Sequence, residues 1–376
     1  MILKGRFFVP FLIFAAVLVG FLYTGPQILI WRAVESQGRT YLPIQYTIET
    51  NELEMDLPRA REIYDGHLMP SELFLSEKGP SLLNYLPVLF SSLPFFIFGG
   101  DVSLAHLFSG FFFSTLLFLA FYLLGFSVTK NKSWSFFFAF LGTLTPLARY
   151  MVRAFFNWDY FLNLAVKNFY PLVKSPLEFL FLHKAADPLI TFLIYLPAIA
   201  SIVWFWRKPS KMNSIAAGIL LGLLFYTYLH YWVYLLATVG LLGFYAFLNR
   251  RRDFRRLKSF LFLAGVLTVT TIPYLVNYLM FINSTSAGEV LDRLGVVEYG
   301  RYFRIYGVKG DYLFYLALAA AVYVIFWKIR KKRDAAVLWW AFILAIFIAW
   351  NIQLIFGYIP KQRHSYSGDH LYPTVS

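Results

Sequence analysis

The 376-residue chain contains no cysteine and few charged residues. The absence of cysteine excludes disulfides, thiolate metal sites and cysteine nucleophiles. Charged residues make up 14% of the chain, whereas 59% of its residues are hydrophobic and 21% are aromatic. No soluble domain of this size has such a balance. Walker, Rossmann, His-Glu-x-x-His and Gly-x-Ser-x-Gly motifs are also missing, so the usual signatures of nucleotide, zinc-peptidase and hydrolase sites are absent.

Apolar runs of about 20 residues recur along the whole chain instead. Because these runs are continuous and do not alternate with polar residues, they exclude a porin-like barrel and predict an all-α polytopic protein of the cell membrane. The first run is too long for a typical signal-peptide core, so we expect it to be retained as a span. We expect about nine transmembrane helices, at residues 7–30, 103–125, 134–150, 188–206, 214–228, 230–248, 259–279, 312–327 and 335–357.

The net charge of +14 is distributed as in a membrane protein and not as in a nucleic-acid-binding protein. With the N-terminus inside, the cytoplasmic segments hold 18 of the 34 lysines and arginines and only two acids, Asp253 and Asp334. This excess of basic residues inside agrees with the positive-inside rule and places the C-terminus outside. We therefore expect membrane lipids as partners and no nucleic acid.

The apolar stretch 82–98 does not fit this topology as a further span. Counting it would move Lys130 and Lys132 outside and invert every later loop, and Pro87 and Pro94 interrupt it. We interpret it as an amphipathic or half-inserted helix at the outer membrane face.

The long connections all lie on the predicted outer side, at residues 31–102, 151–187 and 280–311. The cytoplasmic connections are short, and no internal repeat or Gly/Ser linker is present. We expect a single membrane domain over residues 1–376, with its functional site in the outer loops and no soluble domain.

The first outer loop contains an acid-rich segment, residues 54–70, that predicts a short helix. Asp56, Arg59 and Glu62 are spaced three residues apart, which places them on one helix face, and Pro58 suits a first helical turn. Asp56 is then either a catalytic carboxylate, acting as general base or divalent-cation ligand, or an N-cap with surface ion pairs. Lys78, further along the loop, either pairs with a lipid phosphate or reaches from the membrane surface to water.

The second outer loop offers a similar choice. Arg149 and Arg153 lie one helical turn apart, and Asp159 follows them. The arginines either bind phosphate or belong to an ordinary interfacial cluster, and Asp159 is the candidate second carboxylate beside Asp56. A lone histidine in such a loop, such as His183, is more often a surface residue than a ligand.

The last span ends in amides, Asn351 and Gln353. Polar amides in a span either bridge helices or contact substrate, and bridging is the more common role. His230 lies in the middle of an apolar run whose length predicts two helices joined by a tight outer turn. The candidate substrate contacts are Glu54, Arg61, His183, His230, Asn351, Gln353 and His364.

The loop resembles the first outer loop of GT-C type integral-membrane glycosyltransferases. The resemblance rests on Asp56, on the arginines and Glu62 that follow it, on Asp65-Gly-His-Leu-Met-Pro70, and on the run from Lys78-Gly-Pro80 to Phe98-Gly-Gly. Oligosaccharyltransferase catalytic subunits, protein O-mannosyltransferases and lipid A aminoarabinose transferases have loops of this kind. The chain departs from them in having no adjacent acidic pair, Gly79 for a proline, no Trp-Trp-Asp motif and no soluble C-terminal domain, so we expect a short or truncated member.

The resemblance implies sugar transfer from a polyprenyl-phosphate-linked donor to a glycan, lipid or protein acceptor, with inversion. It implies Asp56 and Asp159 as catalytic residues and, if Mg²⁺ or Mn²⁺ takes part, as metal ligands. Lys78, Arg59, Arg153 and Arg149 are then the donor-phosphate contacts. Two alternatives from other classes remain open: a transporter or flippase of lipid-linked saccharides, and a non-catalytic subunit of envelope assembly.

Overall fold

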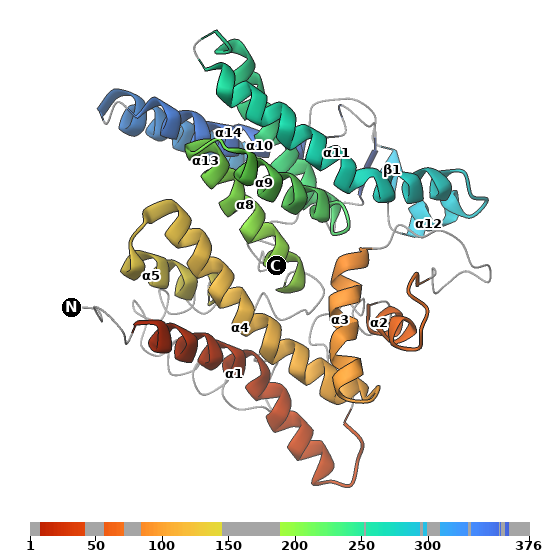
Figure 1. Cartoon of the computed structure of the whole chain (residues 1–376). Helices are drawn as coiled ribbons and strands as arrows, with labels where there is room; N and C mark the ends of the chain where they lie inside the picture. Colours follow the sequence, from red (N-terminus) through yellow and green to blue (C-terminus); the bar gives the residue numbers. More distant parts are fainter. Residues whose placement is uncertain are drawn as a thin grey trace. The chain divides into compact units, whose positions relative to one another are not determined.

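The structure is a computed structural model that describes residues 8–41, 56–70, 84–144, 189–251, 253–293, 296–298, 309–329, 332–352, 354 and 358–360. This part is helical except for one two-stranded sheet, in agreement with the predicted all-α class (Figure 1). The helices are α1 (Phe8–Glu35), α2 (Leu57–Tyr64), α3 (Tyr85–Ile97), α4 (Val102–Thr129), α5 (Lys132–Thr143), α8 (Thr191–Arg207), α9 (Lys211–Leu224), α10 (Leu229–Leu248), α11 (Phe254–Ile282), α12 (Ala287–Arg293), α13 (Lys309–Val322), the π-helix η4 (Tyr323–Ile329) and α14 (Arg333–Trp350). The antiparallel strands are β1 (Val296–Glu298) and β2 (Tyr358–Pro360).

Each predicted span overlaps one of these helices, but only some of the helices are long enough to cross a bilayer. Five of the described helices combine sufficient length with sufficient apolarity: α1, α4, α10, α11 and α14. Helices α8 and α9 have 17 and 14 residues, which at about 1.5 Å per residue is shorter than a hydrocarbon core of about 30 Å. The structure thus supports a membrane protein, while the number of nine spans stays a prediction.

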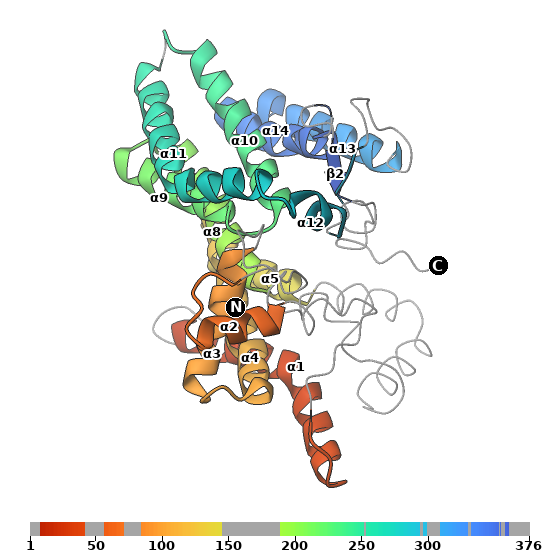
Figure 2. The same ribbon diagram turned by 90° about the vertical axis from the view of Figure 1, so that its right-hand side faces the viewer.

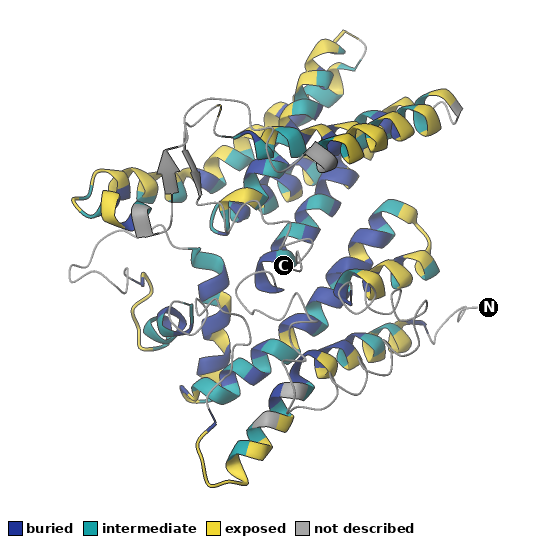
Figure 3. Cartoon of the chain, turned by 180° about the vertical axis from the view of Figure 1, so that it is seen from behind, coloured by how far each residue is buried: buried dark blue, intermediate teal, exposed yellow. Residues whose placement is uncertain are grey.

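Exposed stretches run along these helices (Figure 3), and many of the exposed side chains are large and hydrophobic. In α11, Leu261 and Val269 are 64% and 68% exposed, and the helix buries little of its apolar window. In water such a surface would drive aggregation, whereas lipid tails solvate it at no cost. The exposed leucines and valines therefore fit a bilayer as the solvent.

Short polar side chains set where several helices begin. Asp101 accepts a hydrogen bond from the Leu104 amide at the start of α4, and Asn131 accepts from Ser133 and Trp134 at the start of α5. Ser210 and Asp253 do the same for α9 and α11. Each cap satisfies one or two of the backbone N–H groups that a helix leaves without an internal partner.

The chain divides into two compact units, and the division falls within α8 after Ala200. In the first unit, α1, α4, α5 and the first part of α8 share a hydrophobic core. The buried Tyr23 hydroxyl of α1 donates a 2.6 Å hydrogen bond to the Thr143 carbonyl at the end of α5. Beside this core, α2 packs on α3, as Figures 1 and 2 both show. The predicted interfacial element at 82–98 is α3, a 13-residue helix with Pro94 inside it.

In the second unit, helices that are not adjacent in sequence pack as pairs, α9 with α11 and α10 with α14. The α9–α11 contact uses Gly218 and Gly222, a small-xxx-small pair that lets two backbones approach closely. A Cβ built on Gly218 would lie 2.8 Å from Val266 and 3.0 Å from the Leu263 carbonyl, and one on Gly222 would collide with Thr270. Helices α9 and α11 therefore lie so close together that only glycine fits at positions 218 and 222 without a shift.

We predict that Gly222→Ala destabilises the protein by about 1–3 kcal/mol, because the added methyl meets the stiff, β-branched Thr270. Gly240→Ala in α10 is the matched control, because a Cβ there meets nothing within 4 Å. The control should be neutral or slightly stabilising. Unfolding in mixed detergent micelles measures both variants, and equal stability of the two would contradict the packing argument.

Candidate functional site

The acid-rich segment of the first predicted outer loop forms α2, as predicted. Pro58 lies in the first turn, and Asp56 occupies the N-cap position with φ −78° and ψ −44°. The Asp56 side chain makes no capping hydrogen bond to the helix. Asp56 thus occupies the N-cap position without a side-chain capping hydrogen bond to the helix, and both readings of its role stay predictions.

An apolar contact holds α2 against α3 and the start of α4. Leu57, Ala60 and Ile63 are buried and pack in one cluster with Phe95 of α3 and Ala105 of α4. Burying side chains of this kind contributes about 1.5–3 kcal/mol each for the larger ones. The helix that carries Asp56 is thus a docked element and not a freely moving loop.

Arg61 adds a polar anchor on the other side of α2. Its Nη1 donates a 2.7 Å hydrogen bond to the Gly100 carbonyl, in the turn between α3 and α4. Its Nε donates to Asp65 one helical turn later, at 3.1 Å, and its guanidinium lies 4.9 Å from the centre of the Tyr64 ring. These contacts give Arg61 a structural role, and its predicted contact with substrate stays a prediction.

Arg59 is the buried cation of α2, with 7% of its surface exposed. It lies three residues from Asp56 and three from Glu62, the spacing that places the three side chains on neighbouring positions of one face. Asp56 and Glu62 are half-buried, and Oε2 of Glu62 is buried without a hydrogen-bond partner. Charges in such a partly water-excluded setting interact more strongly than they do at an open surface. The predicted row of an acidic, a basic and an acidic side chain, Asp56, Arg59 and Glu62, is therefore present along α2.

Two further candidates lie in the second unit. His230 is exposed in the first turn of α10, with its ring centre 4.0 Å from that of Tyr231. The predicted tight turn is present, because α9 ends at Leu224 and α10 begins at Leu229. Phe225 and Trp232 stack across this turn with ring centres 4.4 Å apart.

Asn351 bridges two helices, the more common of the two roles considered for it. It is 5% exposed, and its Nδ2 donates to the Tyr312 hydroxyl of α13 at 2.9 Å and to the Phe347 carbonyl of α14 at 2.8 Å. Tyr312 also stacks on Phe347. Asn351 thus joins α13 to α14.

The remaining candidates lie outside the described residues. They are Glu54, Lys78, Arg149, Arg153, Asp159, His183, Gln353 and His364. Of the predicted metal ligands only Asp56 is described, and the described residues include no group of three histidines or acids that would hold a metal ion.

The Arg61–Gly100 contact was missed by reasoning from the sequence. Two features of the sequence pointed toward it: Arg61 and Asp65 are spaced i and i+4, and Gly99 and Gly100 follow at a predicted Phe-Gly turn. Gly100 has φ +87°, and a Cβ there would lie 2.6 Å from Nη1 of Arg61. Both its conformation and its closeness to Arg61 require glycine.

Comparisons of the chain with protein-family models, with curated proteins and with solved structures gave no match. The GT-C resemblance therefore rests on the sequence alone, on the motif-like residues 54–100 and on the placement of Arg153 and Asp159 after the third predicted span. The geometry of α2 and its chemistry carry the functional argument.

We predict that Gly100→Ala loosens α2, because the new methyl displaces the Arg61 guanidinium and the residue must also keep a positive φ. Gly99→Ala is the control: Gly99 has φ +59°, but a Cβ there meets nothing within 4 Å. Limited proteolysis within residues 56–70 should be faster for Gly100→Ala than for Gly99→Ala. Equal cleavage rates would show that the Arg61 contact does not hold α2.

Proposed function

We propose that the protein is a membrane glycosyltransferase that moves a sugar from a polyprenyl-phosphate-linked donor to an acceptor at the outer membrane face. The observation that carries this proposal is the half-buried Asp56 at the start of a docked helix, where it makes no capping hydrogen bond. A lipid-linked donor has to be met at the membrane surface, and α2 packs on α3, the helix predicted to lie there.

The proposed reaction is one inverting displacement. The acceptor oxygen attacks the anomeric carbon of the donor, and the bond from that carbon to the phosphate oxygen breaks. The phosphate leaves with the electron pair, and Asp56 takes the proton of the acceptor hydroxyl as general base. Lys78 and the predicted arginines stabilise the charge that develops on the phosphate. This displacement needs no metal, and chelation with EDTA in the transfer assay tests whether one takes part.

The proposal needs α2 to lie on the outer side of the membrane, and contacts within the first unit are consistent with that position. The Ser103 hydroxyl at the start of α4 donates to the Tyr41 carbonyl after α1, at 3.0 Å, and both positions are predicted outside. The Lys132 ammonium lies 5.1 Å from the centre of the Phe8 ring, and both are predicted at the inner surface. These contacts support antiparallel α1 and α4 with α2 on the outer side.

Contacts within the second unit also agree with the predicted sides of the membrane on which its segments lie. Strands β1 and β2 pair, and they come from the third outer segment and the outer C-terminal tail. Arg256 pairs with Asp334, and both belong to predicted cytoplasmic segments. Pairing of this kind requires the two segments of each pair to lie on one side of the membrane.

Burial favours an enzyme over the transporter alternative. A transporter of charged saccharide lipids is expected to hold ionisable side chains near the bilayer centre. Among the described residues, Arg59 is the only charged side chain in the buried class, and it lies on α2 and not in a span. The described residues therefore give no buried charged side chain within a candidate span, which supports the enzyme proposal over a transporter.

We predict that Asp56→Asn folds and inserts normally but lowers sugar transfer about 10²–10⁴-fold, because the amide keeps the size of the side chain and loses its basicity. The assay follows consumption of radiolabelled polyprenyl-phosphate-hexose by protein in nanodiscs, with and without EDTA. Asp65→Asn is the control, since it makes the same substitution on the half-exposed partner of Arg61, where an ion pair contributes at most about 1 kcal/mol.

Normal turnover by Asp56→Asn would remove the catalytic role of Asp56 and favour a non-catalytic subunit. No consumption by the wild type with a panel of donors would favour transport, which the same lipids in proteoliposomes can test. Loss of activity in EDTA that Mg²⁺ or Mn²⁺ restores would add a metal to the mechanism.

We predict that Lys78→Ala weakens use of the donor more than use of the acceptor, because Lys78 is proposed to contact the donor phosphate. The KM for donor should rise about tenfold, the loss expected for one ion-paired contact, while the KM for acceptor stays unchanged. Lys208→Ala, at the predicted inner surface, is the control. Equal effects on the two KM values would contradict the assignment.

A further inference from the structure

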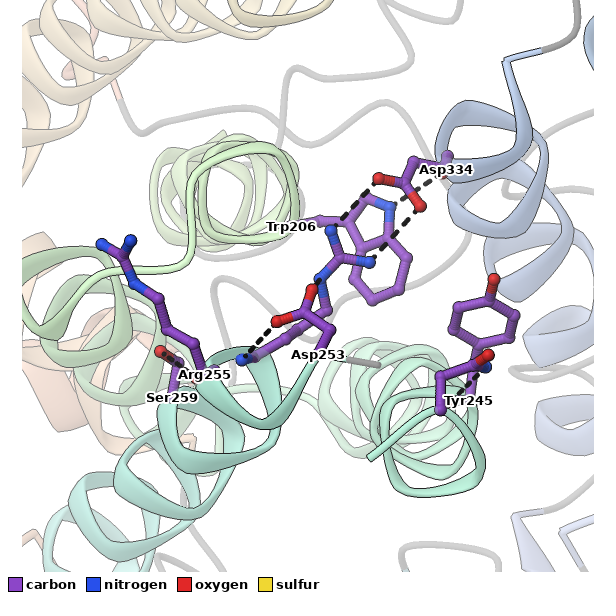
Figure 4. A network of polar contacts seen from close by, with 8 residues as sticks. Trp206, Tyr245, Asp253, Arg255, Ser259 and Asp334 are labelled. Carbon is purple, nitrogen blue, oxygen red and sulfur yellow. Dashed lines mark hydrogen bonds and ion pairs between the residues drawn. The ribbon is translucent and has the colours of Figure 1, made fainter. Parts of the chain in front are cut away.

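A cluster of charges in the second unit holds three helices together at the predicted inner surface. The Arg256 guanidinium of α11 forms a two-pronged ion pair with Asp334 of α14, at 3.3 and 3.1 Å, and its Nε lies 3.2 Å from Asp253 (Figure 4). The same guanidinium lies 4.5 Å from the centre of the Trp206 ring, and the Trp206 indole donates a 2.8 Å hydrogen bond to the Asp334 carbonyl. Both acids of the predicted cytoplasmic segments thus form ion pairs with the same arginine, Arg256.

A cavity of about 520 Å³ lies beside this cluster, between the end of α8 and the start of α14. Its basic lining residues are Arg207, Lys332 and Arg333, all exposed. Its apolar lining includes Leu338 and Trp339 of α14. The cavity therefore has a cationic rim and an apolar wall.

The charge balance of the cavity is positive. Three basic side chains line it against one carboxylate, Asp334, and both oxygens of that carboxylate already face the Arg256 guanidinium. Asp334 is thereby neutralised by a residue outside the lining. The rim is left with an excess of positive charge.

We propose that this cavity binds an anionic phospholipid. Arg207, Lys332 and Arg333 take the phosphate of the headgroup, and an acyl chain lies along the half-buried Ala335 and Trp339. The occupant follows from the two kinds of lining: a phosphate matches the cationic rim, and a hydrocarbon chain matches the apolar wall of a helix that is long and apolar enough to cross a bilayer. With the predicted topology the lipid belongs to the cytoplasmic leaflet.

The test titrates the purified full chain in detergent with phosphatidylglycerol or with phosphatidylcholine and follows thermal unfolding. Phosphatidylglycerol should raise the unfolding temperature, and phosphatidylcholine should do so much less. In the Arg207→Gln/Arg333→Gln double variant, the apparent affinity for phosphatidylglycerol should fall about tenfold or more. Arg250→Gln/Arg255→Gln is the matched control, because it removes the same charge from exposed arginines of the same predicted surface that do not line the cavity.

A second variant keeps the proposal testable if the double variant does not fold. Ala335→Leu narrows the half-buried apolar wall and leaves every charge in place, so it should weaken phosphatidylglycerol binding as well. Equal responses to the two lipids, or equal losses in the two double variants, would overturn the proposal. Glycerophosphoglycerol, the headgroup without chains, should have little effect, and full stabilisation by it would show a site for soluble phosphates instead.

This proposal is independent of the glycosyltransferase proposal. Asp56 lies in the first unit, so Asp56→Asn should respond to phosphatidylglycerol as the wild type does. Loss of lipid selectivity in the cavity variants and loss of sugar transfer in Asp56→Asn are separate outcomes.

Discussion

The lack of hydrogen-bonding partners in a bilayer is the constraint on which this structure depends. Helices satisfy their own backbone groups, but any polar side chain between them needs a further partner. In this protein that partner is repeatedly a main-chain carbonyl of the neighbouring helix. The hydroxyl of Tyr23 bonds to Thr143, that of Tyr234 to Phe342, and the Trp340 indole to Ala319. These contacts link helices without placing a charge in the membrane interior.

In the five described helices that could span a bilayer, charged side chains lie only near the helix ends. Lysines and arginines that remain in excess favour one side of the membrane. The two acids of the predicted inner segments, Asp253 and Asp334, both pair with Arg256. The nearby Arg207 and Arg333 belong to the cationic rim of the proposed lipid cavity. Structural ion pairing and the proposed lipid site thus lie side by side in the second unit.

The site on α2 is built from local and distant contacts. Its apolar face docks by Leu57, Ala60 and Ile63, and Arg61 adds a polar contact with Gly100 in the turn between α3 and α4. Both anchors use residues other than Asp56, so docking fixes the start of the helix where the proposed base lies. A positioned acid on a fixed helix is what a general base requires.

The sequence alone predicted where most of the described helices lie, because helix formation depends on local features. Apolar run length located the helices, Pro58 and the acids located α2 with Asp56 at its start, and an amide at the end of a span located the bridge made by Asn351. Eight of the candidate residues, including Lys78 and Asp159, lie outside the described residues and stay predictions.

The tertiary structure decided which helices pack together. It also decided that Arg61 donates a hydrogen bond to the Gly100 carbonyl and that Arg256 pairs with both Asp253 and Asp334. Arg256 and Asp334 are 78 positions apart in the sequence. No periodicity encodes such a contact, because it arises only when packed helix faces bring their ends together.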